Sequence, residues 1–530
     1  MSELRLVPAA VAVWAASLIV IVAGTGPACA AVAILALMCL LARQAGQAIL
    51  VAGLGLASTV VATLRCRIAA AWHFGDQIRG TVSGQPKHVE TGSWIVRLRI
   101  DGHPSTLTVF APDLPEGIVP GASVTATGRI GESGVPSVNP YVLNGQIDLV
   151  SPPRGFAAVA EHVRTTFAEA VAAQVGPGTK GLIPGMVLGD TTGQTVTDQQ
   201  AYIDTGLSHL SAVSGSNVAI VTTAAVVAAT LLGLGLRLRL IAAAGALLGF
   251  AALVGPEPSV LRASVTGLVG LVAVLASTRT EPIHALCLSI IGLVLVDSDL
   301  AVHYGFALSV AATAGIVALS PLLYRALAAT GWPDILVRAL SVAIAADVVT
   351  MPIVALMAGR VSLISAAANV LVAPVTAPIT VLGLVAAALS LISGGLEAPL
   401  LFVIEPLAWW VHTIATVGAS LPIATAPVGP VTALVAYGWI LAGIIAKRPR
   451  LTAAMTLAAL CLNHTPTAPV LDADVAQLRP HVVATKTGIE PVPPGTQLVV
   501  VLESGRPPKR PTMTQEGIPV IFPNKIEPGN

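Results

Sequence analysis

The residues best suited to chemistry lie inside or beside long apolar runs, where polar side chains are costly and therefore mark candidate functional positions. His209 precedes the sequence Ser-Gly-Ser-Asn at 214–217, which interrupts what would otherwise be regular helix. An interrupted helix leaves backbone groups free to bind a polar ligand or an ion. Small residues in this pattern also permit close helix packing, and both interpretations stay open at this point.

Five other polar side chains fall within apolar segments. Arg262 lies one turn inside a predicted helix, where its planar guanidinium would either suit phosphate oxygens or reach back toward the lipid headgroups. Asp347 and Asn369 lie well inside two later segments. Glu405 and His412 are seven residues apart and share one helix face. That spacing is compatible with a proton relay, but it favours an internal hydrogen-bonding role.

The chain carries no recognisable catalytic or metal-binding signature. It has no Gly-x-Ser-x-Gly elbow, no P-loop and no paired-carboxylate motif. No two of the ten histidines lie within five residues of each other, and the cysteines are scattered. We therefore expect no catalytic residue, no metal, no cofactor and no enzymatic activity of the chain's own.

Composition sets the elements that must position these residues. The 530 residues are 55% hydrophobic and only 10% charged, with a mean hydropathy of +0.83, whereas soluble domains carry roughly 25% charged residues. This excludes a soluble enzyme, a disordered protein and a basic protein that coats DNA. Because the net charge is only +1, an anionic partner would have to be met by local charges.

Charge-free apolar runs predict a polytopic α-helical membrane protein of about 11–12 spans. The expected spans are 6–24, 27–42, 46–64, 206–234, 240–255, 259–277, 283–297, 303–323, 336–357, 363–391, 398–418 and 428–446. Basic residues between them are expected to mark cytoplasmic turns; they are Arg237, Arg239, Arg279, Arg325, Lys447, Arg448 and Arg450. Keeping these residues on one side requires one broken or re-entrant segment, which we expect at 370–380 because it holds two prolines.

A water-facing island follows the third span. Of the 28 basic and 27 acidic residues, 22 fall within 65–205. Short alternating stretches with Gly and Pro turns predict a small extracellular β-barrel of the OB type; they are 78–83, 93–100, 105–110, 123–130 and 145–150. OB-folds often bind single-stranded nucleic acid, so Trp94, Arg97 and Arg99 are candidate DNA contacts, although a structural cap is the interpretation that we prefer.

The expected domain order follows from these patterns. It comprises N-terminal transmembrane helices (1–64), an extracellular OB-like β domain (65–153), an amphipathic interfacial helix (154–180, helical over 156–174), a transmembrane channel domain (181–463) and a short proline-rich tail (464–530) with one strand-like stretch at 497–502.

Four blocks between 181 and 380 resemble, in their order, the ComEC-type competence family, the inner-membrane channels that import DNA during bacterial transformation. The blocks are Leu188-Gly-Asp with Thr205-Gly-Leu-Ser-His-Leu-Ser-Ala-Val-Ser-Gly-Ser-Asn, then Pro258-Ser-Val-Leu-Arg-Ala, then Gly305-Phe-Ala-Leu-Ser, and a set from Asp347 through Pro352, Gly359-Arg-Val-Ser, Asn369 and Pro374. The island at 65–153 stands where that family carries its OB-like domain.

The resemblance implies passage of one DNA strand through the membrane while the other strand is degraded outside. The pathway candidates are then Asp190, His209, Ser214, Gly215, Asn217, Arg262, Asp347, Arg360 and Asn369. Many relatives have histidine where this chain has Asn217. Relatives often end in a metallo-β-lactamase-like domain with a His-x-His-x-Asp-His motif. Because this tail has only His464 and His481, we expect that domain and its nuclease activity to be absent.

The function that fits best is inward conduction of single-stranded DNA across the inner (plasma) membrane. The expected partners are single-stranded DNA, the lipid bilayer, a cytoplasmic motor or helicase and extracellular DNA-receptor proteins, while the oligomeric state is left open. The main alternative is a secondary transporter of a small polar or anionic solute, built on the same broken helices. An envelope enzyme and a relative with little role in transformation are further alternatives.

Overall fold

The computed structural model describes residues 4–89, 93–211, 213–275, 281–392, 394–422, 424–446, 448, 451–452 and 455, together with short strands between 480 and 521. The chain divides into two compact units, the first comprising Met1–Val89 and Ser93–Thr452, and the second Glu90–Gly92 and Ala453–Asn530. All of the candidate residues named above lie in the first unit.

The described helices include seven that are long and apolar enough to cross a membrane and five shorter apolar ones. The seven are α3 (Ala45–Ala70), α9 (Leu236–Val254), α10 (Pro258–Leu275), α12 (Tyr304–Ala328), α13 (Asp334–Ala358), α14 (Ser365–Leu389) and α15 (Ala398–Ala419). The five are α1 (Val7–Ala23), α2 (Thr25–Leu41), α8 (Gly215–Leu231), α11 (Pro282–Val296) and α16 (Pro430–Ile445). The remaining helices are α4 (Phe156–Gln174), α5 (Pro177–Lys180), α6 (Leu182–Leu188), α7 (Val196–Asp204) and the 3-10 turn η1 (Ser298–Ala301).

Two expectations about the spans need correction. The segment expected over 206–234 is a loop as far as Ser214 and becomes helical only at Gly215. The break expected at 370–380 is wrong, because α14 continues through Pro374 and Pro378. The two prolines are four residues apart, so they interrupt the hydrogen bonds of one helix face only. The irregular backbone lies instead in the short helices α5–α7 and the loop that follows them.

The island folds into the predicted five-stranded closed barrel. Its strands are β1 (Ile78–Val82), β3 (Trp94–Arg99), β4 (Thr106–Ala111), β5 (Ser123–Glu132) and β6 (Tyr141–Ser151), and the short strand β2 (Lys87–His88) extends the sheet at β3. The strand order is β1-β5-β6-β4-β3, and β1 pairs with β3 to close the ring. Inward side chains such as Val96, Leu98, Leu107 and Val109 fill the barrel interior.

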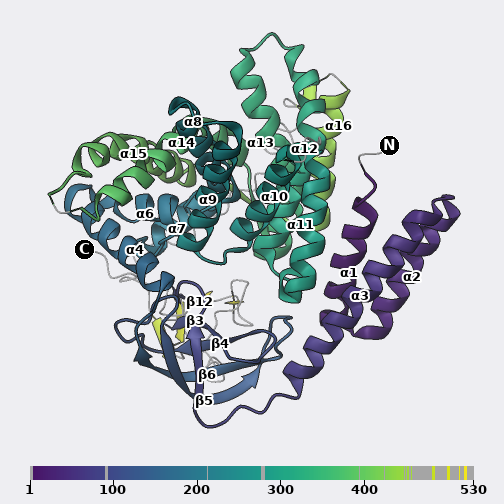
Figure 1. Ribbon diagram of the computed structural model, residues 1–530, viewed down its shortest axis with the longest axis horizontal. Coiled ribbons are helices and arrows are strands. Elements are labelled where there is room, and N and C mark those ends of the chain that lie inside the picture. The colour runs from purple at the N-terminus through teal and green to yellow at the C-terminus, as the bar shows by residue number, and fades with distance from the viewer. Residues whose placement is uncertain are drawn as a thin grey trace. The chain divides into compact units, whose positions relative to one another are not determined.

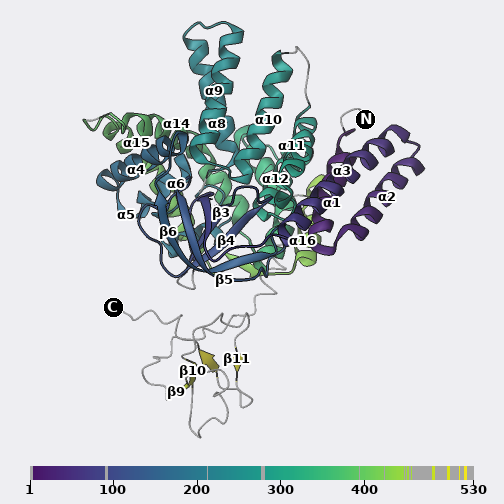
Figure 2. The ribbon, with the colours of Figure 1, turned by 60° about the horizontal axis from the view of Figure 1, so that its bottom comes forward.

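The barrel is bound to the helices through the turn between α11 and α12. Asp299 Oδ2 accepts a hydrogen bond from Ser105 Oγ at 2.5 Å, and Asp299 Oδ1 accepts one from the Val138 amide at 2.7 Å. At the end of α3, Arg65 donates to Ser298 Oγ at 2.9 Å and to the Val296 carbonyl at 2.6 Å. Figure 1 shows α3 leading from the group α1–α3 into the barrel, and Figure 2 shows the barrel strands from below.

Helix α4 matches the predicted amphipathic segment residue for residue, but one of its charges is not on the surface. The helical period puts Arg164 on the polar face, but its side chain is buried and donates to the Leu253 carbonyl at 2.8 Å and to Glu161 at 2.9 Å. A carboxylate and a helix C-terminus together satisfy this buried cation. The apolar face of α4 packs with α6, α14 and α15 in one core.

Two smaller sheets complete the described structure. Strand β7 (Arg360–Ser362) pairs with β8 (Thr425–Pro427) and so ties the α13–α14 turn to the segment after α15. The second unit contains β9 (Pro480–Val483), β10 (Leu498–Val501), β11 (Thr512–Met513) and β12 (Pro519–Ile521). In the sheet, these strands lie in the order β11-β12-β10-β9. The strand expected at 497–502 is confirmed by β10, and three more strands accompany it.

Candidate functional site

The first turn of α8 contains the polar sequence that interrupts the predicted span. Ser214 is the N-cap residue, but no side chain caps the helix, because Ser214 Oγ lies 2.6 Å from Ser216 Oγ and 3.3 Å from Asn217 Oδ1. Asn217 is buried, and its Nδ2 donates to the Met186 carbonyl of α6 at 2.7 Å. Asn217 therefore ties α8 to the fully buried helix α6.

Arg262 faces this turn from α10. The side chain is only 7% exposed, and its Nε donates to Ser309 Oγ of α12 at 2.8 Å. A Cβ atom at Gly215 would lie 2.9 Å from Arg262 Nη2, so the guanidinium lies against the start of α8 and glycine leaves it room. Within the described part of the chain, no carboxylate comes within 4.0 Å of Arg262.

Asp347 and Asn369 meet through a third residue, Ser365, at the start of α14. Asp347 Oδ1 accepts from Ser365 Oγ at 3.2 Å, and Asn369 Nδ2 donates to the Ser365 carbonyl at 3.0 Å. Gly206 packs directly on Ser365, since a Cβ atom there would collide with the hydroxyl. The loop that carries His209 thus lies on the first turn of α14.

His209 itself is exposed and makes one local contact, from Nδ1 to the Gly206 carbonyl at 3.1 Å. Ser208 and Ser216 are exposed too, in the segment that leads into the apolar helix α8. Exposed polar side chains in such a region need a water-filled surface, because lipid cannot satisfy them. The loop and the start of α8 therefore form one polar surface at the barrel end of α10.

The barrel brings further cations to the same end of the bundle. Arg97 and Arg99 are exposed on one face of β3, as predicted, whereas Trp94 lies on the alternate face and contacts the His88 ring edge-on. Burial and the nearby charges of Arg97 and Lys87 lower the pKa of His303, the residue that caps α12. The basic edge of the barrel therefore lies close to the start of α12.

A cavity of about 240 Å³ separates the barrel from the helices at this junction. Arg99 and Gln85 line it from the barrel, Arg164 lines it from α4, and Glu257 lines it from the α9–α10 turn. A second cavity, of about 400 Å³, shares Gln85 and Arg164 and extends to Asp190. Asp190 is held in a local turn, since its Oδ1 accepts from the Thr192 amide at 3.1 Å.

The model of the family described as "Competence protein" matches residues 186–450. The chain belongs to the Competence protein family. No curated protein and no solved structure matches it. The matched region of this competence protein begins inside α6 and contains every transmembrane candidate, whereas the barrel lies before it.

Two candidates of the competence protein lie apart from the polar surface. Arg360 forms a 3.3 Å ion pair with Asp204 at the end of α7, and both side chains are partly exposed. Asp190 lies in the cavity beside the barrel. The structure therefore brings together Ser214, Gly215, Asn217 and Arg262, and separately Asp347 and Asn369 with the loop of His209.

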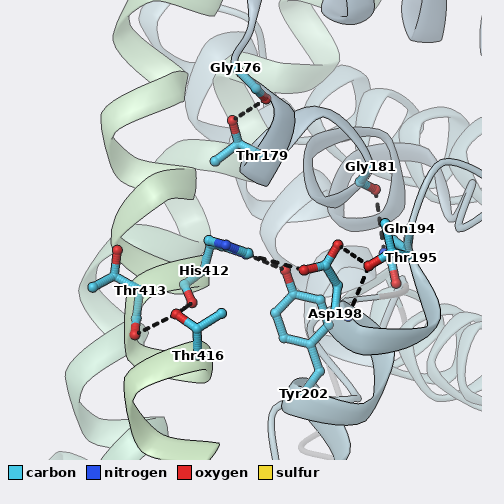
Figure 3. A network of polar contacts seen from close by, with 10 residues as sticks. All are labelled: Gly176, Thr179, Gly181, Gln194, Thr195, Asp198, Tyr202, His412, Thr413 and Thr416. Atoms are coloured by element: carbon cyan, nitrogen blue, oxygen red, sulfur yellow. Dashed lines mark hydrogen bonds and ion pairs between the residues drawn. The ribbon is translucent and has the colours of Figure 1, made fainter. Parts of the chain in front are cut away.

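A second polar network, which the sequence did not reveal, joins α7 to α15 (Figure 3). His412 Nδ1 lies 3.4 Å from the Tyr202 hydroxyl and 3.8 Å from Asp198 Oδ1. The motif Thr195-x-x-Asp198 is a helix-capping signature that would have located the start of α7, and Thr195 Oγ1 does accept from the Asp198 amide at 3.1 Å.

Glu405, on the same face of α15 as His412, accepts from the Gly176 amide at 2.8 Å. Both side chains thus hold α15 to the segment that contains α5 and α7. This agrees with the internal hydrogen-bonding role that the sequence favoured over a proton relay.

Proposed function

We propose that this protein conducts single-stranded DNA inward across the inner membrane, from the barrel to the far ends of the helices. Family membership indicates a role in competence and DNA uptake, and the apolar helices make the chain a multi-pass membrane protein. The observation that carries the conduction proposal is the polar surface formed by Ser208, His209 and Ser216, which is exposed at the start of the apolar helix α8 and lies beside the mostly buried Arg262.

The orientation is supported by the position of the basic turns. Helix α3 enters the barrel at its C-terminal end, so Arg43 lies at the far end of 26 helical residues. Helices α9 and α12 meet the barrel region at Val254 and Tyr304, so Arg237 and Arg325 lie at their opposite ends. Because basic turns face the cytoplasm, the barrel would be extracellular. Arg65 and Arg67, near the barrel end of α3, depart from this pattern, and Arg65 holds α3 to the turn before α12.

Partners complete the proposed function. The matched region carries no nucleotide-binding motif, so a cytoplasmic motor or helicase would supply the driving force. Extracellular DNA-receptor proteins would deliver DNA to the barrel, and a separate nuclease would degrade the other strand. Purified protein should then show no metal-dependent cleavage of DNA, and cleavage that a chelator abolishes would refute this part of the proposal.

The test is the transformation frequency of a deletion strain complemented with variants that insert normally. Asn369→Leu should abolish transformation, because it removes the amide that bonds to Ser365, the buried residue that contacts Asp347 and on which the loop of His209 packs. Thr376→Val, on the same helix, is the matched control: among the described residues, the Thr376 hydroxyl donates to the Val372 carbonyl alone, and Val372 has no polar side chain that leads to another helix. Normal transformation with Asn369→Leu would remove this surface from the DNA path.

A secondary transporter of a small polar solute is the alternative that the intramembrane Asp347 favours. Asp347→Asn separates the two functions, because it keeps the hydrogen-bonding shape and removes the charge. A DNA conduit should keep most of its transformation frequency, whereas an ion-coupled transporter should lose solute uptake. Glu405 and His412 are already engaged in contacts between helices.

A further inference from the structure

We infer that the start of α8 and the guanidinium of Arg262 form a binding site for one phosphate group. Its natural ligand rests on the proposed function: it would be a phosphodiester of the incoming DNA strand. The site is defined by the backbone amides of Gly215 and Ser216 and the Nη atoms of Arg262.

The helix supplies one half of the site. Helix α8 has 17 residues, and the amides of its first turn point away from the helix body with no side-chain cap, although Ser214 occupies the N-cap position. A helix N-terminus carries a partial positive charge of roughly +0.5 and presents free N–H groups. Oxyanions bind at such termini for this reason.

Arg262 supplies the other half. Its side chain is 93% buried by accessible surface, as the exposed fraction is 7%. Only Nε has a hydrogen-bond partner among the described residues, namely Ser309, and that contact fixes the guanidinium plane against Gly215. The Nη atoms have no hydrogen-bond partner among the described residues, and they are not fully shielded from solvent. An anion between Arg262 and the helix terminus would therefore meet free donors on a mostly buried cation.

Two further observations favour a ligand that arrives from solvent. Ser216 is exposed and Ser214 is half-exposed, so the site opens onto the polar surface that also includes His209. A Cβ atom at position 215 would lie 2.9 Å from Arg262 Nη2 and 3.2 Å from the Ala263 side chain, so only glycine lets the guanidinium lie this close to the first amides of α8. The planar fork of arginine binds phosphate oxygens in pairs, which suits a phosphodiester better than a single-oxygen ligand.

The site also lies where a strand would enter the helices. Ser259, in the first turn of α10, approaches the Val213 carbonyl at 3.5 Å, so the start of α8 is level with the barrel end of α10. The cations Lys87 and Arg97 of the barrel act on His303, six residues before Ser309 on α12. Both the cations of the barrel and Arg262 therefore act near the first turns of α12.

The experiment uses the full chain in phosphatidylcholine nanodiscs and a fluorescent fifteen-nucleotide thymidine strand. Arg262→Gln should weaken binding by about ten-fold, the effect expected for losing hydrogen bonds to a charged group. It should also reduce the slope of log affinity against log salt by about 0.7, the value for one phosphate on a single strand. Arg43→Gln, which removes an exposed arginine from the α2–α3 turn, should change neither quantity.

Ser309→Ala guards against a folding defect, because it keeps the charge of Arg262 and removes only the contact that orients it. This variant should show an intermediate loss of affinity. Inorganic phosphate should compete with the strand for the wild-type protein and compete less for Arg262→Gln. Unchanged affinity and salt slope in both variants would overturn the site.

The two proposals fail in different ways. If inorganic phosphate binds at Arg262 but a methylphosphonate strand binds as well as the natural one, the site takes free phosphate, and its assignment to the DNA backbone is overturned. If the strand binds through Arg262 while the wild-type gene fails to restore transformation to a deletion strain, the proposed function fails and the site stands.

Discussion

At the scale of single residues, Asn217 illustrates how a polar side chain at a broken helix can be structural. Its amide bonds to the Met186 carbonyl of a helix whose seven residues are all buried, and its oxygen accepts from Ser214. Arg262, in contrast, has Nη donors with no hydrogen-bond partner among the described residues. The two residues therefore have different roles. Asn217 holds the start of α8 in place, whereas Arg262 faces the phosphate that we propose to bind there.

Asn217→Ala should therefore lower stability more than it changes strand affinity. Leaving the buried Met186 carbonyl without its partner costs about 1–3 kcal/mol, so the thermal midpoint of the purified protein should fall. Ser216→Ala is the control, since its exposed hydroxyl bonds to Ser214 alone among the described residues. Equal midpoints for Asn217→Ala and wild type would show that the contact to α6 carries no stability.

The sequence predicted which polar side chains are unusual, because their residue types stand out in apolar runs. It did not predict the hydrogen-bond partners of these side chains, because the partners are far away in the sequence. A charged Arg262 in an apolar run is conspicuous, but Ser309 is 47 positions away and has an ordinary side chain. Ser365, which joins Asp347 to Asn369, was missed for the same reason. Contacts between helices depend on how the helices pack, and no periodicity in one segment records that.

At the scale of elements, the cap of α12 couples the barrel junction to pH. The Gly305 amide donates to His303 Nδ1 at 3.1 Å, and this requires the neutral imidazole. Burial and then the charge of Arg97 lower the pKa of His303 from 6.5, with Lys87 acting in the same sense and Glu257 and Asp299 opposing.

Because the unfolded chain then binds more protons near pH 6, stability should rise with pH through this range and fall on acidification below about 6.5. His303→Asn keeps a capping oxygen without a titrating group. Between pH 7.5 and 5.5, the thermal midpoint of the variant should fall by less than that of the wild-type protein. The same loss in both proteins would show that His303 does not contribute to the pH dependence.

Elements whose hydrophobic residues recur at a regular interval were predictable from the sequence. The residues at which a helix begins or breaks were not. Alternation located all five barrel strands, and a helical period located α4 at 156–174. The start of α8 was expected eight or more residues too early because 206–213 is apolar enough to resemble a span. The prolines of α14 suggested a break, but contacts with α4, α6, α8 and α15 support a continuous helix.

At the scale of the whole molecule, one carboxylate joins the barrel to the helices that match the competence family. Asp299 accepts hydrogen bonds from two barrel segments, at Ser105 and at Val138. Asp299→Ala should weaken this junction by about 1.5–3 kcal/mol, as for hydrogen bonds to a charged group, and should speed amide hydrogen exchange at Val138. Asp148→Ala, an exposed barrel carboxylate, is the control. Unchanged exchange at Val138 would show that the junction depends on other contacts.

The orientation can be measured on intact cells with single cysteines in a cysteine-free background. Asp148→Cys on the barrel should react with a membrane-impermeant maleimide, because the basic turns place the barrel outside. Trp332→Cys, in the turn between α12 and α13 and 46% exposed, should react only after permeabilisation. The reverse pattern would invert the orientation.

The route of the strand is tested most directly by crosslinking during uptake. A photoreactive amino acid at position 216, on the polar surface, should attach to labelled DNA in cells that are transforming. The same amino acid at Val227, an exposed apolar position farther along α8, should attach to lipid and not to DNA. DNA captured at position 216 and not at 227 is the predicted result, whereas active uptake with no DNA captured at 216 would contradict a path through these helices.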